Sequence, residues 1–312
     1  MKPSLAEDAQ LDKVIYPCGV QPKIDGVRAL QLGTQLTGRS LDPFEGFGIT
    51  EYFSGLLPGG DGEMTLGSVP NSEERLCSLT TGAVGRFKDV TEMANLHWWV
   101  FDLVDAESVS RGYHERYLSV SARVRALDHP RIHIVPMRVA HNRAELDAII
   151  AELFDDNYEG AIIRNLNAPY KEGRATQKGQ QLWRVKPWAD FEIRVTKIFA
   201  AEENTNEKKT NTLGRSERSS AKAGKVAKEM LGSMEGIMLA DFYNPITKKL
   251  MFKKGLLITA GRGEMTAAQA ADYYHNPDKI VGHIVKVKTM THGVKVKPRF
   301  PTYVSHRLLQ DL

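Results

Sequence analysis

The 312-residue chain has little cysteine, few aromatic residues (8%) and no long apolar segment. Cys18 and Cys77 have neither paired nor metal-ligand spacing, which leaves no basis for a disulfide framework or a thiolate metal site and suits a reducing cytoplasm. No stretch approaches the roughly 18 apolar residues of a membrane span, and residues 1–12 lack the apolar run of a secretion signal. We therefore expect a cytoplasmic protein with no membrane partner, and we take it to be a monomer.

Acidic residues are absent between Lys279 and Gln310, where seven Lys or Arg residues occur. Another seven lie in residues 205–228, against Glu207 and Glu217, among many Ser, Thr, Asn and Gly residues. The net charge is only +4, so its distribution is more informative than its total. Two acid-poor stretches in one half favour a polyanionic partner, most simply nucleic acid. We expect a flexible basic insertion at about 204–230, either a solvated loop or a segment that binds such a polyanion.

Up to about Pro187 the chain alternates strand-like and helical patterns, and 42% hydrophobic residues suffice for about two domains. The apolar runs predict strands at 27–36, 97–104 and 160–163. Asn142, with Glu145 three residues later, is typical of a helix start, and apolar residues follow at helical spacing. The first half is therefore expected to be mixed α and β.

After Pro187 the pattern changes to short strands. We predict them at 191–199, 236–243, 249–252, 284–288 and 294–297, with one helix at about 266–274. Five strands and one helix fit a small β-barrel such as an OB-fold.

Short polar motifs occur in a fixed order along the first half. The first is Lys23-Ile24-Asp25-Gly26-Val27-Arg28, directly before a strand: a lysine that attacks phosphorus needs a fixed position, and Gly26 permits close approach of the backbone. Four further segments follow. They are Asp61-Gly62-Glu63, Phe101-Asp102-Leu103, Glu159-Gly160-Ala161-Ile162-Ile163-Arg164 and Trp183-Arg184-Val185-Lys186.

This ordered set resembles the covalent nucleotidyltransferase superfamily of DNA ligases, RNA ligases and mRNA capping enzymes. The segment from Arg299 to Arg307 resembles the final motif of small phage-type, ATP-dependent DNA ligases. Capping enzymes typically have an acidic residue near the place of Pro301, and many RNA ligases have Asn in place of Arg28. The resemblance implies an α+β fold: a nucleotidyltransferase (ATP-grasp-like ligase) domain at 1–188 and an OB-fold β-barrel domain at 189–312, with no separate N-terminal DNA-binding domain.

The same resemblance implies that Lys23 takes AMP from ATP and that AMP then activates the 5′-phosphate of nicked duplex DNA. A free lysine has a pKa of about 10.4, so nearby cations such as Arg28, Lys186 and a metal would have to favour its neutral form. Lys23, Arg28 and Lys186 are thus the expected catalytic residues. Glu63 and Glu159 would support Mg²⁺ or Mn²⁺. The full set expected to bind ATP is Gln21, Lys23, Arg28, Arg39, Glu63, Phe101, Glu159, Arg184, Lys186, Arg299 and Arg307.

Within that set, Phe101 would stack on adenine, and Arg299 and Arg307 would orient the pyrophosphate. The sequence departs from the family where Arg164 and Arg184 stand in place of Lys and where Gly38 precedes Arg39 in place of Ser. Two alternatives stay open: an RNA ligase or GTP-dependent capping enzyme, and a non-catalytic OB-type nucleic-acid-binding protein.

Overall fold

The computed structural model describes residues 2–44, 49–71, 76–86, 95–210, 216–245, 248–292, 294 and 296–307. The chain forms two compact units, Met1–Lys186 and Pro187–Leu312. Within the described part of the chain, no helix has the length and apolar character that crossing a bilayer requires.

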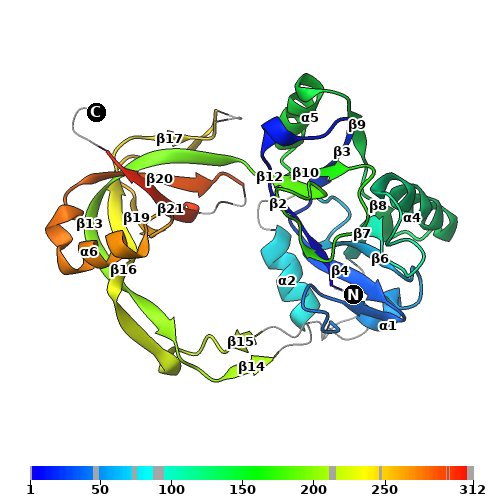
Figure 1. The fold of residues 1–312 in the computed structure, drawn as a ribbon, viewed down its shortest axis with the longest axis horizontal. Helices are drawn as coiled ribbons and strands as arrows, with labels where there is room; N and C mark the ends of the chain where they lie inside the picture. Colours follow the sequence, from blue (N-terminus) through cyan, green and yellow to red (C-terminus); the bar gives the residue numbers. More distant parts are fainter. Residues whose placement is uncertain are drawn as a thin grey trace. The chain divides into compact units, whose positions relative to one another are not determined.

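Two five-stranded sheets make up most of the first unit (Figure 1). One has the strand order β2-β12-β10-β3-β9, with β2 at Glu7–Asp8, β3 at Cys18–Lys23, β9 at Arg138–Ala140, β10 at Gly160–Asn165 and β12 at Leu182–Val185. The other has the order β5-β4-β6-β7-β8, with β4 at Val27–Leu32, β5 at Gln35–Thr37, β6 at Gly60–Leu66, β7 at Leu96–Leu103 and β8 at Ile132–Ile134. A short parallel pair joins β1, Ser4–Leu5, to β11, Gly173–Arg174.

Helices cover one face of each sheet. They are η1 at Leu11–Lys13, α1 at Ile49–Phe53, α2 at Leu76–Arg86, α4 at Tyr113–Leu127 and α5 at Arg143–Asp155. The predicted start of α5 is confirmed, since the Asn142 side chain accepts a hydrogen bond from the Glu145 amide at 3.0 Å. The apolar side of α5 packs against the first sheet, and α1, α2 and α4 contribute to the core of the second.

The two faces of strand β7 have different surroundings, one in the hydrophobic core and the other towards the candidate site. From Leu96 to Asp102 its residues alternate, with Trp98 and Val100 buried and with Trp99 and Phe101 partly exposed. Because successive side chains of a strand point to opposite faces, one face of β7 supplies the helix-covered core and the other is available to a pocket.

The second unit contains a closed five-stranded barrel in the order β13-β16-β19-β21-β20 (Figure 1). Its strands are β13 at Trp188–Asn204, β16 at Lys225–Met238, β19 at Leu257–Gly261, β20 at Ile284–Met290 and β21 at Arg299–His306. Outside the barrel ladder lie β14 at Lys208–Thr210, β15 at Ser216–Arg218, β17 at Phe242–Tyr243, β18 at Leu250–Phe252, α6 at Ala267–His275, η2 at Lys222–Gly224 and η3 at Pro277–Lys279. The predicted helix is α6, and a capping box of Thr266 and Gln269 fixes its start.

Two details of the strand prediction were wrong. Val294, Val296 and Lys297 lie outside any strand, and Val296 is 82% exposed, so no neighbouring strand supports an extended conformation there. Strands β19 and β21 were missed. The second contains Pro301, but an extra residue in the β21 ladder between Arg299 and Thr302 makes a bulge, which accommodates a proline that cannot donate a hydrogen bond.

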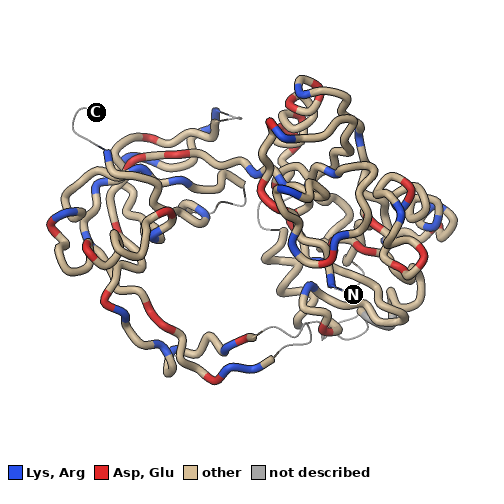
Figure 2. The backbone as a smooth tube through the Cα atoms, viewed as in Figure 1, with Lys and Arg blue, Asp and Glu red and all other residues tan. Residues whose placement is uncertain are grey.

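The basic insertion carries regular structure that the sequence did not predict. Strands β13 and β16 continue their pairing outward to Asn204 and Lys225, and β14 pairs with β15 between them. Basic and acidic residues alternate along this hairpin extension (Figure 2). Every described residue of β14 and β15 is exposed.

Candidate active site

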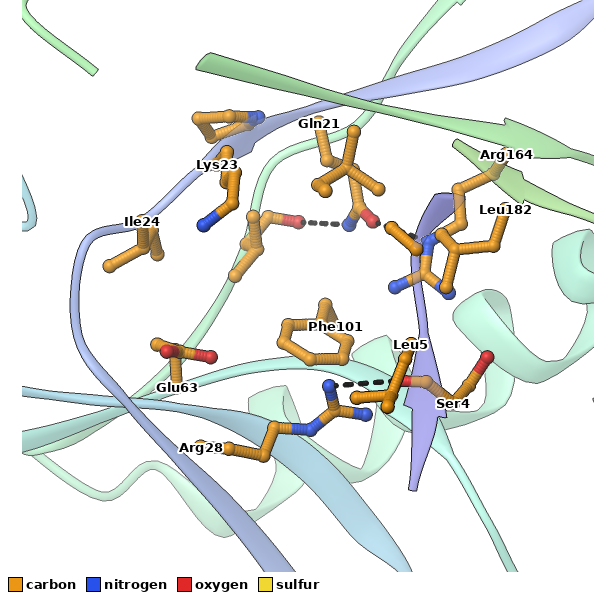
Figure 3. Close-up of a pocket in the computed structure, with 14 residues that line it drawn as sticks. Ser4, Leu5, Gln21, Lys23, Ile24, Arg28, Glu63, Phe101, Arg164 and Leu182 are labelled. Atoms are coloured by element: carbon orange, nitrogen blue, oxygen red, sulfur yellow. Dashed lines mark hydrogen bonds between the residues drawn. The ribbon is translucent and has the colours of Figure 1, made fainter. Parts of the chain in front are cut away.

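A cavity of about 120 Å³ lies between the two sheets of the first unit. One sheet contributes Gln21 and Lys23 from β3 and Arg164 from β10, and the other contributes Glu63 from β6 and Phe101 from β7. Lys23 and Glu63 lie at one end of the cavity, and Arg164 lies at the other, with Phe101 between them (Figure 3). Residues from separate sequence motifs thus meet in one pocket.

Glycines allow the backbone segments around this pocket to approach closely. A Cβ on Gly26 would lie 2.2 Å from the Met64 carbonyl oxygen, and a Cβ on Gly160 would lie 2.0 Å from the Val185 carbonyl oxygen. Both contacts are with backbone and cannot relax by a side-chain rotation. The glycines after Lys23 and Glu159 are therefore required for the packing of β4 on β6 and of β10 on β12.

Glu159 joins two lysines. The ammonium group of Lys23 forms an ion pair with Oε2 of Glu159, and Nζ of Lys186 donates to Oε1 at 2.6 Å. Burial raises the pKa of Glu159, but the two ammonium groups outweigh burial and lower that pKa to about 2. Burial also lowers the pKa of Lys186, partly offset by Glu159, and the nearby Lys23 lowers it further. The site therefore holds one ionised carboxylate between two amines of separate strands.

Glu63 is a second carboxylate at the same end of the pocket, and part of its surface reaches solvent. Burial of the carboxylate raises the pKa of Glu63 to about 7, against the opposing effect of Lys23 and Arg28. Among the described residues, no hydrogen bond or ion pair reaches this carboxylate. An oxygen ligand without a protein partner beside Lys23 is suited to a hard cation.

Arg28 does not point a free guanidinium into the pocket. Its Nε and Nη2 donate to the two oxygens of Asp61, each at 2.5 Å, and its Nη1 donates to the Ser4 carbonyl at 3.1 Å. The guanidinium carbon lies 4.9 Å from the ring centroid of Phe101. The phosphate-binding role that we expected for Arg28 requires this pairing to break, and the observed geometry instead supports the ring of Phe101.

Gln21 and Arg164 lie at the opposite end from Lys23. The Gln21 amide donates to the Val135 carbonyl at 3.3 Å and accepts from the Tyr113 hydroxyl at 2.7 Å. Arg164 donates to Gln21 at 3.3 Å and forms an ion pair with Asp102 at 3.3 Å. A chain of polar contacts therefore fixes the orientation of both side chains around Phe101.

Four expected residues of the first unit do not line this cavity: Glu159 and Lys186, which pair beside Lys23, and Arg39 and Arg184. Arg39 lies in a turn after β5, and Arg184 donates to Asp8 on β2 at 2.7 Å. In the second unit, Arg299 begins β21 and donates to the His292 carbonyl at 3.3 Å, while Arg307 donates to Glu192 at 2.6 Å. Their roles in binding ATP or DNA stay predictions.

A set of buried polar residues lies behind the pocket: Asp61 and Asp102 belong to the motifs, and Asp102 was expected only as a nearby orienting group, but their partners were not predicted from the sequence. Asp102 is fully buried and accepts two hydrogen bonds from Arg116, at 2.8 and 3.2 Å. Asp61 is likewise fully buried. A signal for Asp61 was available, because Asp61 and Glu63 are two apart in a strand-like segment, which is the spacing of side chains on one face. Arg116 and Tyr170 lie in segments with no motif, and nothing in the sequence marked them.

Comparison with known proteins agrees with this geometry. The family model described as "ATP dependent DNA ligase domain" matches residues 3–186. The DNA ligase of African swine fever virus (isolate Tick/South Africa/Pretoriuskop Pr4/1996) is 29% identical over 131 residues, which cover 42% of this chain and 30% of that protein. The DNA ligase of Haemophilus influenzae is 32% identical over 162 residues, which cover 50% of this chain and 54% of that protein.

A solved structure of Chlorella virus DNA ligase-adenylate is 25% identical to this chain, with 98% of both chains covered and a TM-score of 0.52. The first unit thus has the fold of an ATP-dependent ligase nucleotidyltransferase domain. Because the family model matches more than half of the residues, the chain belongs to the ATP-dependent DNA ligase family.

Proposed function

We propose that this chain is an ATP-dependent DNA ligase that seals nicks between a 5′-phosphate and a 3′-hydroxyl in duplex DNA. The observation that carries the proposal is Lys23, which ends β3 beside a pocket between two sheets and shares Glu159 with Lys186. A non-catalytic nucleic-acid-binding protein would not require this arrangement of Lys23, Glu159 and Lys186.

In the proposed reaction, Nζ of Lys23 attacks the α-phosphorus of ATP. A phosphorus–nitrogen bond forms, and the bond to the bridging oxygen breaks to release pyrophosphate. An oxygen of the 5′-phosphate at the nick then attacks the same phosphorus and frees Lys23. Finally, the 3′-hydroxyl attacks the 5′-phosphate, and AMP leaves.

The residues of the pocket divide this work. Phe101, which lies between Lys23 and Arg164, offers a flat face for adenine. Lys186 pairs with the same Glu159 carboxylate as the nucleophile Lys23. It can neutralise charge that develops on the transferred phosphate. Glu159 holds both amines in place until nucleotide enters.

Glu63 and Glu159 fit a divalent cation such as Mg²⁺ or Mn²⁺, bound jointly with nucleotide phosphates. The Glu63 carboxylate has no hydrogen-bond partner within the described residues, and oxygen is the ligand that such ions prefer. The described residues contain no cluster of three or more His, Cys, Asp or Glu that could form a cation site alone. When bound, the ion would polarise the phosphate oxygens.

We further propose that the first unit is the adenylation domain and that the second is an OB-fold domain that binds DNA. Supporting the second assignment, the barrel order corresponds to first, second, third, fifth and fourth strand, and α6 lies between the third and fourth. The basic hairpin between β13 and β16 would contact the phosphates of nicked DNA.

The direct test is incubation with Mg²⁺ and α-labelled ATP or GTP, followed by detection of label on the denatured protein. We expect label from ATP, none with Lys23→Ala, and release of AMP on addition of nicked duplex DNA. Label from GTP would support a capping enzyme instead, release by nicked RNA but not by nicked DNA would support an RNA ligase, and no label would support a binding protein.

A further inference from the structure

A closed ring of hydrogen bonds lies at the base of the pocket wall and plays no part in the chemistry proposed above. The Ser4 amide donates to the Tyr170 hydroxyl at 2.8 Å, and that hydroxyl donates to Oδ2 of Asp61 at 3.3 Å. Asp61 accepts both hydrogen bonds from Arg28, whose third nitrogen donates back to the Ser4 carbonyl at 3.1 Å. Figure 3 shows the last of these bonds beside Phe101.

The ring attaches the start of a short segment, which is also held further along where Arg174 donates to the Ala6 carbonyl and where β2 pairs with β12. Strand β1 contains two residues, Ser4 and Leu5, and its strand partner among the described residues is β11. The Leu5 carbonyl accepts from the Ala175 amide at 2.8 Å. A ladder of this length is marginal by itself. Ser4, Leu5 and Ala6 all line the pocket, and the ring holds the Ser4 end of this wall through its amide and its carbonyl.

The protonation states of the ring members agree with these directions of donation. Burial raises the pKa of Tyr170, and the Asp61 carboxylate raises it further, so the hydroxyl keeps its proton at neutral pH. The Tyr170 hydroxyl, which both accepts and donates, thus links the Ser4 N–H to this buried ion pair.

We propose that Tyr170 is a positioning residue of the nucleotide pocket: its hydroxyl ties β1 to the Asp61–Arg28 pair and so fixes the wall that contacts the nucleoside of ATP. The inference rests on the proposed function. Loss of the tie affects binding of the nucleoside more than reaction at Lys23, because Lys23 lies at the other end of the pocket from Ser4 and Leu5 (Figure 3).

The test uses the full chain and compares Tyr170→Phe, Ser4→Pro and the double variant in formation of the Lys23–AMP adduct. Tyr170→Phe removes the hydroxyl, and Ser4→Pro removes the donating amide without changing Tyr170. Each single variant is expected to raise the KM for ATP about three- to tenfold, as for loss of one partly buried hydrogen bond, with the maximal rate changed less than about twofold. Both changes break the same link. The KM of the double variant is therefore expected to equal the larger of the two single-variant KM values.

Tyr16→Phe is the matched control, because the Tyr16 hydroxyl is buried in the same unit with no hydrogen-bond partner in the described part of the chain. Its KM is expected to equal that of the wild type. An unchanged KM in Tyr170→Phe overturns the inference, as does an additive double variant. A rise in KM that is matched by an equal fall in the maximal rate, together with a lower Tm, also overturns it, because these changes indicate general destabilisation. A wild-type chain that takes no label from ATP overturns the proposed function itself, which distinguishes the two failures.

Discussion

An ion pair joins Lys23 to Glu159, two residues that are 136 positions apart in the sequence. Strands β3 and β10 create it, because Gly160 and Lys23 are direct partners in their antiparallel ladder. The second oxygen of Glu159 holds Lys186, which follows β12 on the other side of β10. The three strands therefore place two amines on one carboxylate by their register alone.

Glu159→Gln is expected to slow formation of the Lys23–AMP adduct on the order of 100-fold, the effect of a misplaced reacting group. The substitution keeps the size of the side chain and removes the charge that attracts both amines. Single-turnover labelling at saturating ATP and Mg²⁺ measures the rate. Glu152→Gln is the control, since Glu152 pairs with Arg138 on the surface. Wild-type loading by Glu159→Gln would show that the shared carboxylate has no role in positioning Lys23.

Glu63 makes stability depend on pH in a defined direction. Its pKa in the folded protein is about 7, above the ordinary 4.5, so the folded state binds this proton more tightly than the unfolded state. The resulting stabilisation is complete below about pH 4.5 and is lost as pH rises through 7. Without divalent cations, Glu63→Gln is therefore expected to be more stable than the wild type at pH 8, by roughly 1–3 kcal/mol after allowance for solvent at the pocket.

Urea unfolding at about pH 4.5 and pH 8 measures this difference, which should be present only at the higher pH. Addition of millimolar Mg²⁺ to the ATP-bound protein should then raise the Tm of the wild type at pH 8 more than that of Glu63→Gln, because the ion bound with the phosphates needs the ionised carboxylate. Glu115→Gln, at an exposed position on α4, should behave as the wild type throughout. A stability difference that is the same at both pH values would contradict the raised pKa.

The parts of the fold that could be predicted are those that residues close together in the sequence determine. The existence of strand β7, the capped start of α5 and the position of α6 each follow from residues within one element, whereas the burial alternation of β7 was not predicted. The order of the motifs was sufficient to select Lys23, Glu63, Phe101 and Glu159 together. Each motif ends or begins a strand or lies within one, so a sheet register brings them to one place.

What could not be predicted depends on contacts between distant segments. Nothing near Tyr170 indicates that its hydroxyl reaches Ser4, 166 positions away, or that it also reaches Asp61. The pairing of Arg28 with Asp61, a fully buried aspartate on the neighbouring strand, was likewise not predicted, and the phosphate-binding role of Arg28 stays a prediction. Strand β21 was missed because a bulge, which has no sequence signal of its own, accommodates Pro301.

Arg307→Ala is expected to slow formation of the Lys23–AMP adduct at least about tenfold more than sealing of a nick that already carries AMP. The reason is that orientation of pyrophosphate is needed only while ATP reacts. Labelling with ATP and sealing of pre-adenylylated DNA measure the two steps separately. Arg194→Ala removes a barrel arginine that donates to the Gly282 carbonyl, and serves as the control. Equal losses in both steps would refute the role of Arg307.

The basic hairpin provides a test of how the chain binds DNA. Because Asn204 pairs with Lys225 at the end of the β13–β16 ladder, residues 205–224 can be replaced by an Asn-Gly turn without disturbing the barrel. The replacement removes Lys208, Lys209, Arg215, Arg218 and Lys222 together with Glu207 and Glu217. If the hairpin binds phosphates, the dependence of log K on log salt for nicked duplex DNA should become shallower by about 0.9 for each phosphate that the variant no longer neutralises.

Formation of the Lys23–AMP adduct, which needs no DNA, should keep its wild-type rate and so report that the first unit is intact. An unchanged salt slope with weaker binding would mean that the hairpin acts by shape and not by charge, and an unchanged affinity would assign DNA binding to the remaining basic residues of the barrel.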